Sequence, residues 1–213
     1  MSFPHSRLRR LRQSSEMLSL TSETRLSVED FVYPIFVIHG HGKKIPIEPM
    51  PGMYQLSVDM LAEEINEVTS LGIQSVLLFG IPETKDATGS GGIDTNGVIQ
   101  VAIREIKTLD PNLIVMTDVC LCDYTDHGHC GIIKGSNIDN DATLPLLQEM
   151  AVSHAQNGAD VVAPSAMMDG QVGAIRSSLD SAGKKDTVIM GCLLYTSDAA
   201  DDTPCVDLGG RRI

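Results

Sequence analysis

Short apolar runs alternate along most of the chain with amphipathic stretches. The runs have strand length, and a strand buried on both faces reads as a continuous apolar run. The first contains Pro34, which fits poorly in the middle of a sheet. Because parallel strands need crossover connections, this alternation indicates a parallel sheet covered by helices. The predicted strands are residues 32–38, 75–79, 113–116, 160–163 and 187–190.

The stretches between these runs carry apolar residues at helical spacing. Leu61, Ile65 and Val68 share one face of the first predicted helix. Ser57 is expected to be its N-cap, and Gly72 is expected to end it. The predicted helices span about 57–70, 97–108, 142–157 and 171–182.

Two α/β architectures fit this pattern, a doubly wound sheet and a (β/α)8 barrel. No Gly-x-Gly-x-x-Gly turn follows the first strand, which disfavours a dinucleotide-binding fold. Asp118, Cys120 and Cys122 follow the third strand, and Ser165 follows the fourth. Barrel enzymes carry their catalytic residues at these strand ends. A full barrel takes ~250 residues, so the chain is expected to form roughly the first half of a (β/α)8 TIM barrel.

Composition and charge exclude several classes of function. The 213 residues can bury a core, and a composition of 42% hydrophobic and 21% charged residues is ordinary for a globular protein. No stretch approaches the ~18 apolar residues of a membrane span. The formal net charge of -12 argues against nucleic-acid binding, because phosphate contacts need clustered Lys and Arg. We therefore expect a cytoplasmic protein that binds neither nucleic acid nor membrane.

The N-terminal segment is basic. Arg7, Arg9, Arg10 and Arg12 all precede the first acidic residue, Glu16. The segment is either a solvated arm or a piece of an organelle transit peptide, and composition favours the arm. It lacks the apolar core of a secretory signal, so export is not expected.

The cysteines give the sharpest chemical signal. Five are present, and an odd number without a signal peptide fits a reducing compartment, where neighbouring thiols bind metal or react more often than they pair. Cys120, Cys122 and Cys130 lie close enough in sequence for one loop to fold three thiolates onto a zinc ion. Three protein ligands leave one tetrahedral position open, as in catalytic zinc sites. The alternative is three core or redox cysteines.

Other polar residues of this loop have two interpretations each. His127 and His129 are either ligands or partners that orient the ligands. Asp118 either orients a ligand or a proton, or simply caps a loop.

The stretch from Asp118 to Gly131, with its Cys-x-Cys and Gly-His-Cys-Gly patterns, resembles the metal-binding loop of the porphobilinogen synthase (5-aminolevulinate dehydratase) family. The match is far longer than a lone Cys-x-Cys, and the similarity runs from about residue 6 to residue 190 or 191. Further segments that resemble the family are residues 9–12, 33–37, 48–52, 139–144 and 163–171.

This resemblance implies a TIM barrel with an N-terminal arm that embraces a neighbouring subunit in a homo-octamer. The arm then becomes an assembly element rather than a transit peptide. The implied activity is that of a hydro-lyase of tetrapyrrole (haem) biosynthesis, which condenses two 5-aminolevulinate molecules to porphobilinogen with loss of two waters.

The resemblance also implies roles for individual residues. Some relatives carry carboxylates in place of the cysteines and use magnesium, so Cys120, Cys122 and Cys130 imply the Zn2+ type. An allosteric Mg2+ of the full-length protein would lie mostly outside this chain. Asp118 and Ser165 match positions that line the catalytic site. Ser165 could hydrogen-bond a substrate carbonyl or a water; the alternative is a simple Pro-Ser turn.

The resemblance fails near the end of the chain. The family implies a Schiff-base lysine at position 195, where this chain has Tyr195, which cannot form one. The second such lysine, the lid and the substrate-binding arginines belong to a C-terminal half. Residues 192–213 resemble translated sequencing-adapter DNA, so Cys192 and Cys205 carry no functional weight. We therefore expect an arm (1–30), a partial barrel (31–191) and a non-native tail (192–213).

We expect this chain to be inactive and aggregation-prone, with the first and fifth strands as exposed sheet edges. The alternative is a non-catalytic fragment that binds zinc or joins family oligomers. A zinc hydrolase on a barrel is disfavoured because such enzymes usually use His or carboxylate ligands.

Overall fold

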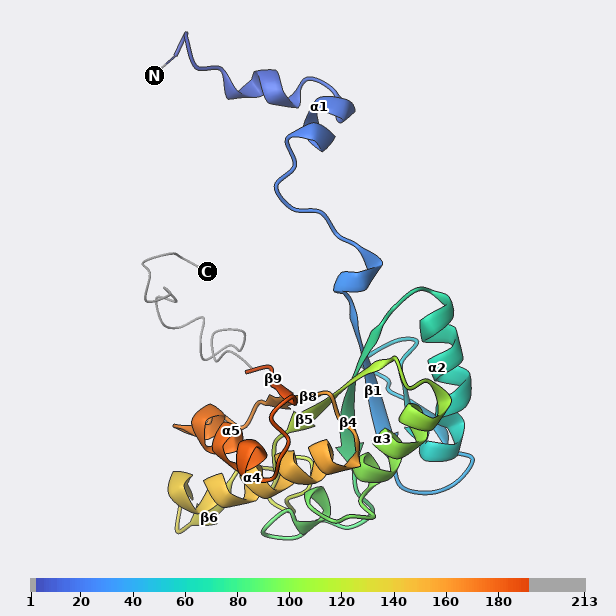
Figure 1. Ribbon diagram of the computed structural model, residues 1–213, viewed down its shortest axis with the longest axis vertical. Coiled ribbons are helices and arrows are strands. Elements are labelled where there is room, and N and C mark those ends of the chain that lie inside the picture. The colour runs from blue at the N-terminus through green and yellow to red at the C-terminus, as the bar shows by residue number, and fades with distance from the viewer. Residues whose placement is uncertain (1–2, 192–213) are drawn as a thin grey trace.

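A computed structural model describes residues 3–191 of the protein (Figure 1). Seven strands form one sheet in the order β2-β3-β1-β4-β5-β8-β9, and β6 and β7 form a separate hairpin. The strands are β1 (Val32–Ile38), β2 (Lys44–Pro46), β3 (Tyr54–Ser57), β4 (Ser75–Ile81), β5 (Ile114–Val119), β6 (Ile132–Lys134), β7 (Asn137–Asp139), β8 (Val161–Pro164) and β9 (Val188–Ile189). The α-helices are α1 (Ser15–Leu20), α2 (Leu61–Ser70), α3 (Val98–Leu109), α4 (Asn140–Asn157) and α5 (Gln171–Ser181), and the 3-10 turns are Leu8–Arg12, Val28–Asp30, Val58–Met60 and Ser90–Gly92.

Strands β1, β4, β5, β8 and β9 are parallel and lie side by side in chain order. A doubly wound sheet carries helices on both faces, whereas a barrel carries them on its outer face only. Helices α2 to α5 all pack on one face of this sheet, which confirms the predicted barrel-type arrangement over the doubly wound alternative. All five predicted strands and all four predicted helices are present.

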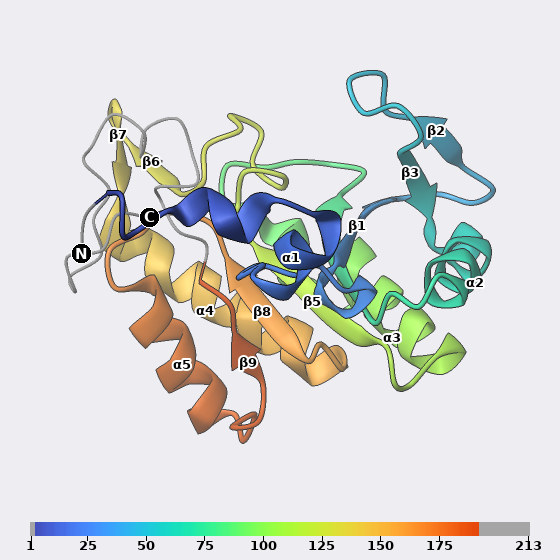
Figure 2. The same cartoon turned by 90° about the horizontal axis from the view of Figure 1, so that it is seen from above.

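Helices α2 to α5 pack on one face of the sheet (Figure 2). One buried cluster joins β1, β4 and β5 to α2 and α3, and includes Leu78 and Ile103. A second joins β5 and β8 to α4 and α5, and includes Val162 and Leu147. On the opposite face, which a closed barrel would enclose, Val188 is 56% exposed.

The expectation that β1 would be a bare edge is wrong. Strand β3 pairs in parallel with Phe36–Ile38 of β1, and β2 pairs antiparallel with β3. Both added strands are short, and Pro46 ends β2, so neither gave a strand pattern in the sequence. At the other side, β9 is the last strand of the sheet within the residues described.

Ser57 does not cap α2 as predicted. Its hydroxyl instead accepts a hydrogen bond from the Lys43 backbone N–H at 2.9 Å, and a 3-10 turn separates it from the helix. The predicted end of α4 is correct, because Gly158 adopts a left-handed φ of 110° there. The start of α4 lies at Asn140, where Asp139 caps it by accepting from the Ala142 N–H at 3.0 Å.

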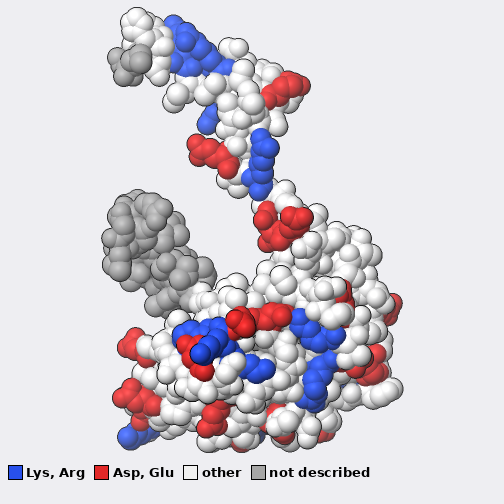
Figure 3. Space-filling view, in the orientation of Figure 1, with Lys and Arg blue, Asp and Glu red and all other residues white. Residues whose placement is uncertain are grey.

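Residues 3–31 project from the barrel body as an extended arm (Figure 1). All their side chains are exposed, and Arg9, Arg10 and Arg12 lie near the outer end, where Figure 3 shows a basic patch. Ser27 and Asp30 form a capping box just before β1. None of the helices described has the length and apolar character needed to cross a bilayer.

Candidate metal and catalytic site

The predicted residues Asp118 and Ser165 meet at the carboxyl ends of two neighbouring strands. Strand β5 is longer than predicted, so Asp118 lies within it and pairs in register with Ala163 of β8. The Ser165 hydroxyl donates a 2.6 Å hydrogen bond to Asp118 Oδ1. Its backbone N–H also donates to the Val119 carbonyl at 3.3 Å, which extends the ladder one step beyond β8.

The pKa of Asp118 is raised to about 7, chiefly by burial and to a smaller extent by the nearby charges of Cys122 and Asp123, while the Ser165 hydrogen bond opposes the shift. A carboxyl group with such a pKa can both take up and release a proton near neutral pH. Asp123 was given no role by the sequence. Burial, followed by the Cys122 charge, raises its pKa to about 6.

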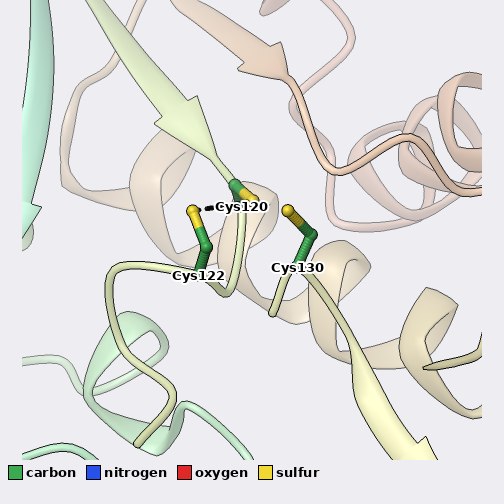
Figure 4. A group of neighbouring side chains, drawn as sticks. All are labelled: Cys120, Cys122 and Cys130. Atoms are coloured by element: carbon green, nitrogen blue, oxygen red, sulfur yellow. Dashed lines mark hydrogen bonds between the residues drawn. The ribbon is translucent and has the colours of Figure 1, made fainter. Parts of the chain in front are cut away.

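The three cysteines converge on one point (Figure 4). Cys120 directly follows β5, Cys122 lies two residues on, and Cys130 returns just before β6. All three sulfur atoms lie within 4.8 Å of one another, and the Cys120 and Cys122 sulfurs are 3.3 Å apart. A Zn–S bond of ≈ 2.3 Å implies about 3.8 Å between thiolates of a tetrahedral site. The cluster could therefore hold one metal ion.

The protons of these thiols are unevenly shared. Hydrogen bonds from Cys120 and Cys122 lower the pKa of the Cys130 thiol to about 3. Hydrogen bonds with Cys122 and Cys130, together with burial, raise the pKa of Cys120. Metal ligation needs thiolates and releases protons, so one thiolate is already favoured in the cluster and two protons remain to be displaced.

His127 and His129 do not join the group of sulfur atoms that could hold an ion. His127 Nδ1 accepts from the His129 backbone N–H at 3.1 Å, and its Nε2 lies 3.4 Å from the Ala87 carbonyl. Their rings lie 5.6 Å apart and tilted. The structure therefore disfavours ligation by these histidines, and the hydrogen bonds of His127 described above join it to backbone atoms of Ala87 and His129.

The predicted features of residues 192–213, including Tyr195, Cys192 and Cys205, lie outside the residues that the structure describes. The geometry of the site described above therefore involves residues 3–191 only.

The thiol cluster and the Asp118–Ser165 pair both lie at the C-terminal ends of the strands of a barrel-type sheet. Barrel enzymes carry their active sites at this end of the barrel. The sequence profile described as "Delta-aminolevulinic acid dehydratase" matches residues 5–197. The chain therefore belongs to the delta-aminolevulinic acid dehydratase family. The match extends through residues 192–197, beyond the limit of similarity expected at residue 190 or 191.

Individual relatives carry the same name. The protein from Methanothermus sociabilis is 50% identical over 190 residues, which cover 89% of this chain and 59% of the relative. The one from Bacillus subtilis is 47% identical over 220 residues, covering 100% of this chain and 67% of the relative. The chain spans 58% to 63% of the lengths of relatives from Methanothermus, Halalkalibacterium and Archaeoglobus.

A solved structure shares the fold. The Toxoplasma gondii delta-aminolevulinic acid dehydratase (porphobilinogen synthase), crystallised with its reaction product porphobilinogen, superposes with a TM-score of 0.84 at 32% identity. The superposition covers 98% of this chain and 60% of the Toxoplasma chain. The sheet described above accordingly corresponds to part of a TIM barrel.

Proposed function

We propose that this chain is the N-terminal part of a zinc-dependent porphobilinogen synthase, which condenses two 5-aminolevulinate molecules to porphobilinogen. The observation that carries the proposal is the convergence of two groups at one edge of the sheet. Asp118 lies near the end of β5, Ser165 directly follows β8, and Cys120, Cys122 and Cys130 lie in the loop that follows β5. The family membership supports the same reaction.

Cys120, Cys122 and Cys130 would hold the metal. Thiolates favour zinc over magnesium, which prefers oxygen ligands, and three thiolates leave the fourth position free for substrate. When bound, the ion supplies a Lewis acid for the carbonyl or amine of 5-aminolevulinate. The donor set fits this role, because the sulfur separations already approach those of a tetrahedral site.

Asp118 would serve as the proton carrier of this half of the site. Its pKa of about 7 leaves both protonation states populated near neutral pH, as the loss of two waters and the removal of substrate protons require. The Ser165 hydroxyl holds the carboxyl group at one oxygen. We assign Ser165 a second role, donation to the substrate carbonyl when Asp118 is protonated.

The covalent step of the family needs an amine, and position 195 of this chain is a tyrosine. We propose that the chain as written binds zinc and does not turn over. We also propose that residues 1–30 are an assembly arm of a homo-oligomer, an octamer by family, that residues 31–191 are the partial barrel and that residues 192–213 are not native.

The proposal is tested first by metal content. We expect the purified 213-residue chain to hold about one zinc per chain by atomic emission. Cys120→Ser, Cys122→Ser and Cys130→Ser should each lose most of it, because each removes one of the three soft ligands. Cys192→Ser is the matched control and should keep it. Equal zinc in all four variants would overturn the metal site.

Activity is tested separately. Incubation with 5-aminolevulinate and borohydride should trap no adduct on this chain, and no porphobilinogen should form. Porphobilinogen formation would contradict the proposed inactivity. Zinc binding without an adduct is also what a non-catalytic fragment would show. An adduct trapped on Tyr195→Lys and absent from the unsubstituted chain would favour the catalytic scaffold over the non-catalytic fragment.

A further inference from the structure

The loop that follows β4 lies directly against the cysteine loop. The Asp86 backbone N–H donates to the Tyr124 carbonyl at 3.3 Å, and the Asp126 N–H donates to the Asp86 carbonyl at 3.0 Å. Together these bonds form an isolated parallel bridge between Asp86 and Thr125. The bridge lies in the middle of the segment between Cys122 and Cys130, so it fixes the path that joins these two thiols.

The Asp86 side chain holds its own loop in a closed turn. Its Oδ1 accepts from the backbone N–H groups of Thr88 at 2.8 Å and Ser90 at 3.2 Å, and from the Thr88 hydroxyl at 2.9 Å. Its Oδ2 accepts from the Ser90 hydroxyl. These bonds, the Ser90 hydroxyl first, hold the pKa of Asp86 well below its usual value. The turn is therefore built around a permanently ionised carboxylate.

This turn presses Gly89 against the cysteine loop. Gly89 is buried and adopts a left-handed φ of 68°. A Cβ at Gly89 would lie 3.2 Å from Leu121 Cδ2 and 3.3 Å from Tyr124 Cβ. Leu121 and Tyr124 are themselves buried, at 0% and 4% exposure. The turn thus packs against the loop, and a side chain at position 89 would be strained by the left-handed φ and would crowd Leu121 and Tyr124.

We infer that Asp86 is a positioning residue for the three thiols, although it touches none of them. Its carboxylate fixes the 86–90 turn, and the backbone of that turn holds residues 121–126 in the shape that brings Cys122 and Cys130 to Cys120. A metal site preorganised in this way loses less conformational entropy on binding. The inference rests on the proposed metal site.

Asp86→Ala tests it in the full 213-residue chain. We expect zinc affinity, measured by competition with a chromophoric chelator, to fall about 10-fold, within the range found for outer partners of metal ligands. The thiolate-to-cobalt charge-transfer band of the Co2+ form should shift, because the sulfur geometry is no longer fixed. A merely structural role would alter neither the band nor the affinity of the folded fraction.

The matched control is Asp110→Ala. Asp110 Oδ1 also accepts from the backbone N–H two residues on, that of Asn112, at 2.9 Å. It lies before β5, at the opposite end of the strand from the cysteines. This variant should lose some local stability by thermal melting and keep both zinc affinity and the cobalt spectrum.

If Asp86→Ala does not fold, Asp86→Asn tests the positioning role of Asp86 instead. It keeps the Oδ1 acceptor and loses the acceptor for the Ser90 hydroxyl, so a smaller loss of affinity is expected. Unchanged affinity in the folded Asp86 variant, or an equal loss in Asp110→Ala, would overturn the inference alone. Failure of the unsubstituted chain to bind zinc would instead overturn the metal site, and the inference with it.

Discussion

The Ser165 hydroxyl donates a 2.6 Å hydrogen bond to Asp118 Oδ1 and so joins the residue after β8 to the carboxyl end of β5. Asp118 is largely removed from water, so this bond replaces part of its lost hydration. Removal of the donor leaves a half-buried carboxylate without that partner, which costs more than the bond itself contributes. The pair is consequently expected to behave as one energetic unit.

A double-mutant cycle with Asp118→Ala and Ser165→Ala should show this coupling. We expect an interaction free energy of about 1.5–3 kcal/mol at pH 8.5, where Asp118 is ionised, as for hydrogen bonds to charged groups. Urea unfolding of the four proteins measures it. Among the residues described, the Ser181 hydroxyl bonds to the Ser177 carbonyl in α5, so Ser181→Ala should combine additively with Asp118→Ala. Additivity in the Ser165 cycle would contradict the prediction.

Gly80 on β4 is where the barrel body meets Tyr124 of the cysteine loop. A Cβ at this position would overlap the Tyr124 hydroxyl and come within 2.5 Å of Ile99 Cγ1. Gly80→Ala should therefore lower the free energy of unfolding by about 1–3 kcal/mol, the usual cost of overpacking. Thermal and urea unfolding check this value.

A second change separates the two clashes at Gly80. Adding Tyr124→Phe removes the hydroxyl, so Gly80→Ala should cost less in that background. Gly91→Ala is the control, because its Cβ would be no closer than 3.4 Å to Pro82 or Tyr124. An equal cost of Gly80→Ala with Tyr124 or Phe at position 124 would show that the hydroxyl does not set the packing.

Apolar runs predicted the strands well because the central strands are buried by helices. The apolar runs failed to predict the end of a strand where polar and apolar residues alternate. Thr117 and Asp118 belong to β5, although their polarity ended the predicted run at residue 116. Thr117 faces the helices, where His154 satisfies its hydroxyl, and Asp118 faces the other side, where Ser165 does. A strand end with two polar residues on opposite faces has no period that sequence alone can recognise.

The candidate site also has a part that the sequence predicted and a part that it did not. Close spacing in one loop predicted that Cys120, Cys122 and Cys130 would meet, and they do. The Asp86 turn was not predicted, because its contact with Thr125 depends on β4 and β5 being neighbours. Asp86 also stands in a stretch rich in Gly, Ser and Thr that resembles an ordinary surface loop. Only the folded chain shows what it supports.

The arm should contribute to assembly and not to the stability of the barrel body. It buries no side chain, and Leu8, Leu20 and Leu26 are each at least 74% exposed. Deletion of residues 2–26 keeps the Ser27–Asp30 capping box. We expect the melting temperature of the monomer to change little and the sedimentation coefficient of the assembled form to fall.

A second variant keeps the full length of the arm and removes only its exposed leucines. Replacing Leu8, Leu20 and Leu26 with Ser should reduce assembly as the deletion does, since apolar side chains exposed in a segment without its own core need a partner surface. Unchanged sedimentation in both variants would contradict the assembly role.

His154 should make stability depend on pH. It lies fully buried in α4, with Nδ1 3.0 Å from Thr117 Oγ1, and burial lowers its pKa from 6.5 to about 3. Below pH 6.5 the His154 side chain is therefore protonated in the unfolded chain but stays neutral in the folded chain. The contribution of His154 to stability is full above pH 6.5 and falls by about 1.4 kcal/mol per pH unit as the pH drops towards 3. Urea unfolding between pH 7.5 and 5 measures how stability depends on pH, and His154→Gln should flatten that dependence. His41→Gln is the control and should leave it unchanged, because His41 is exposed. Equal slopes of stability against pH in both variants and the unsubstituted protein would refute the prediction.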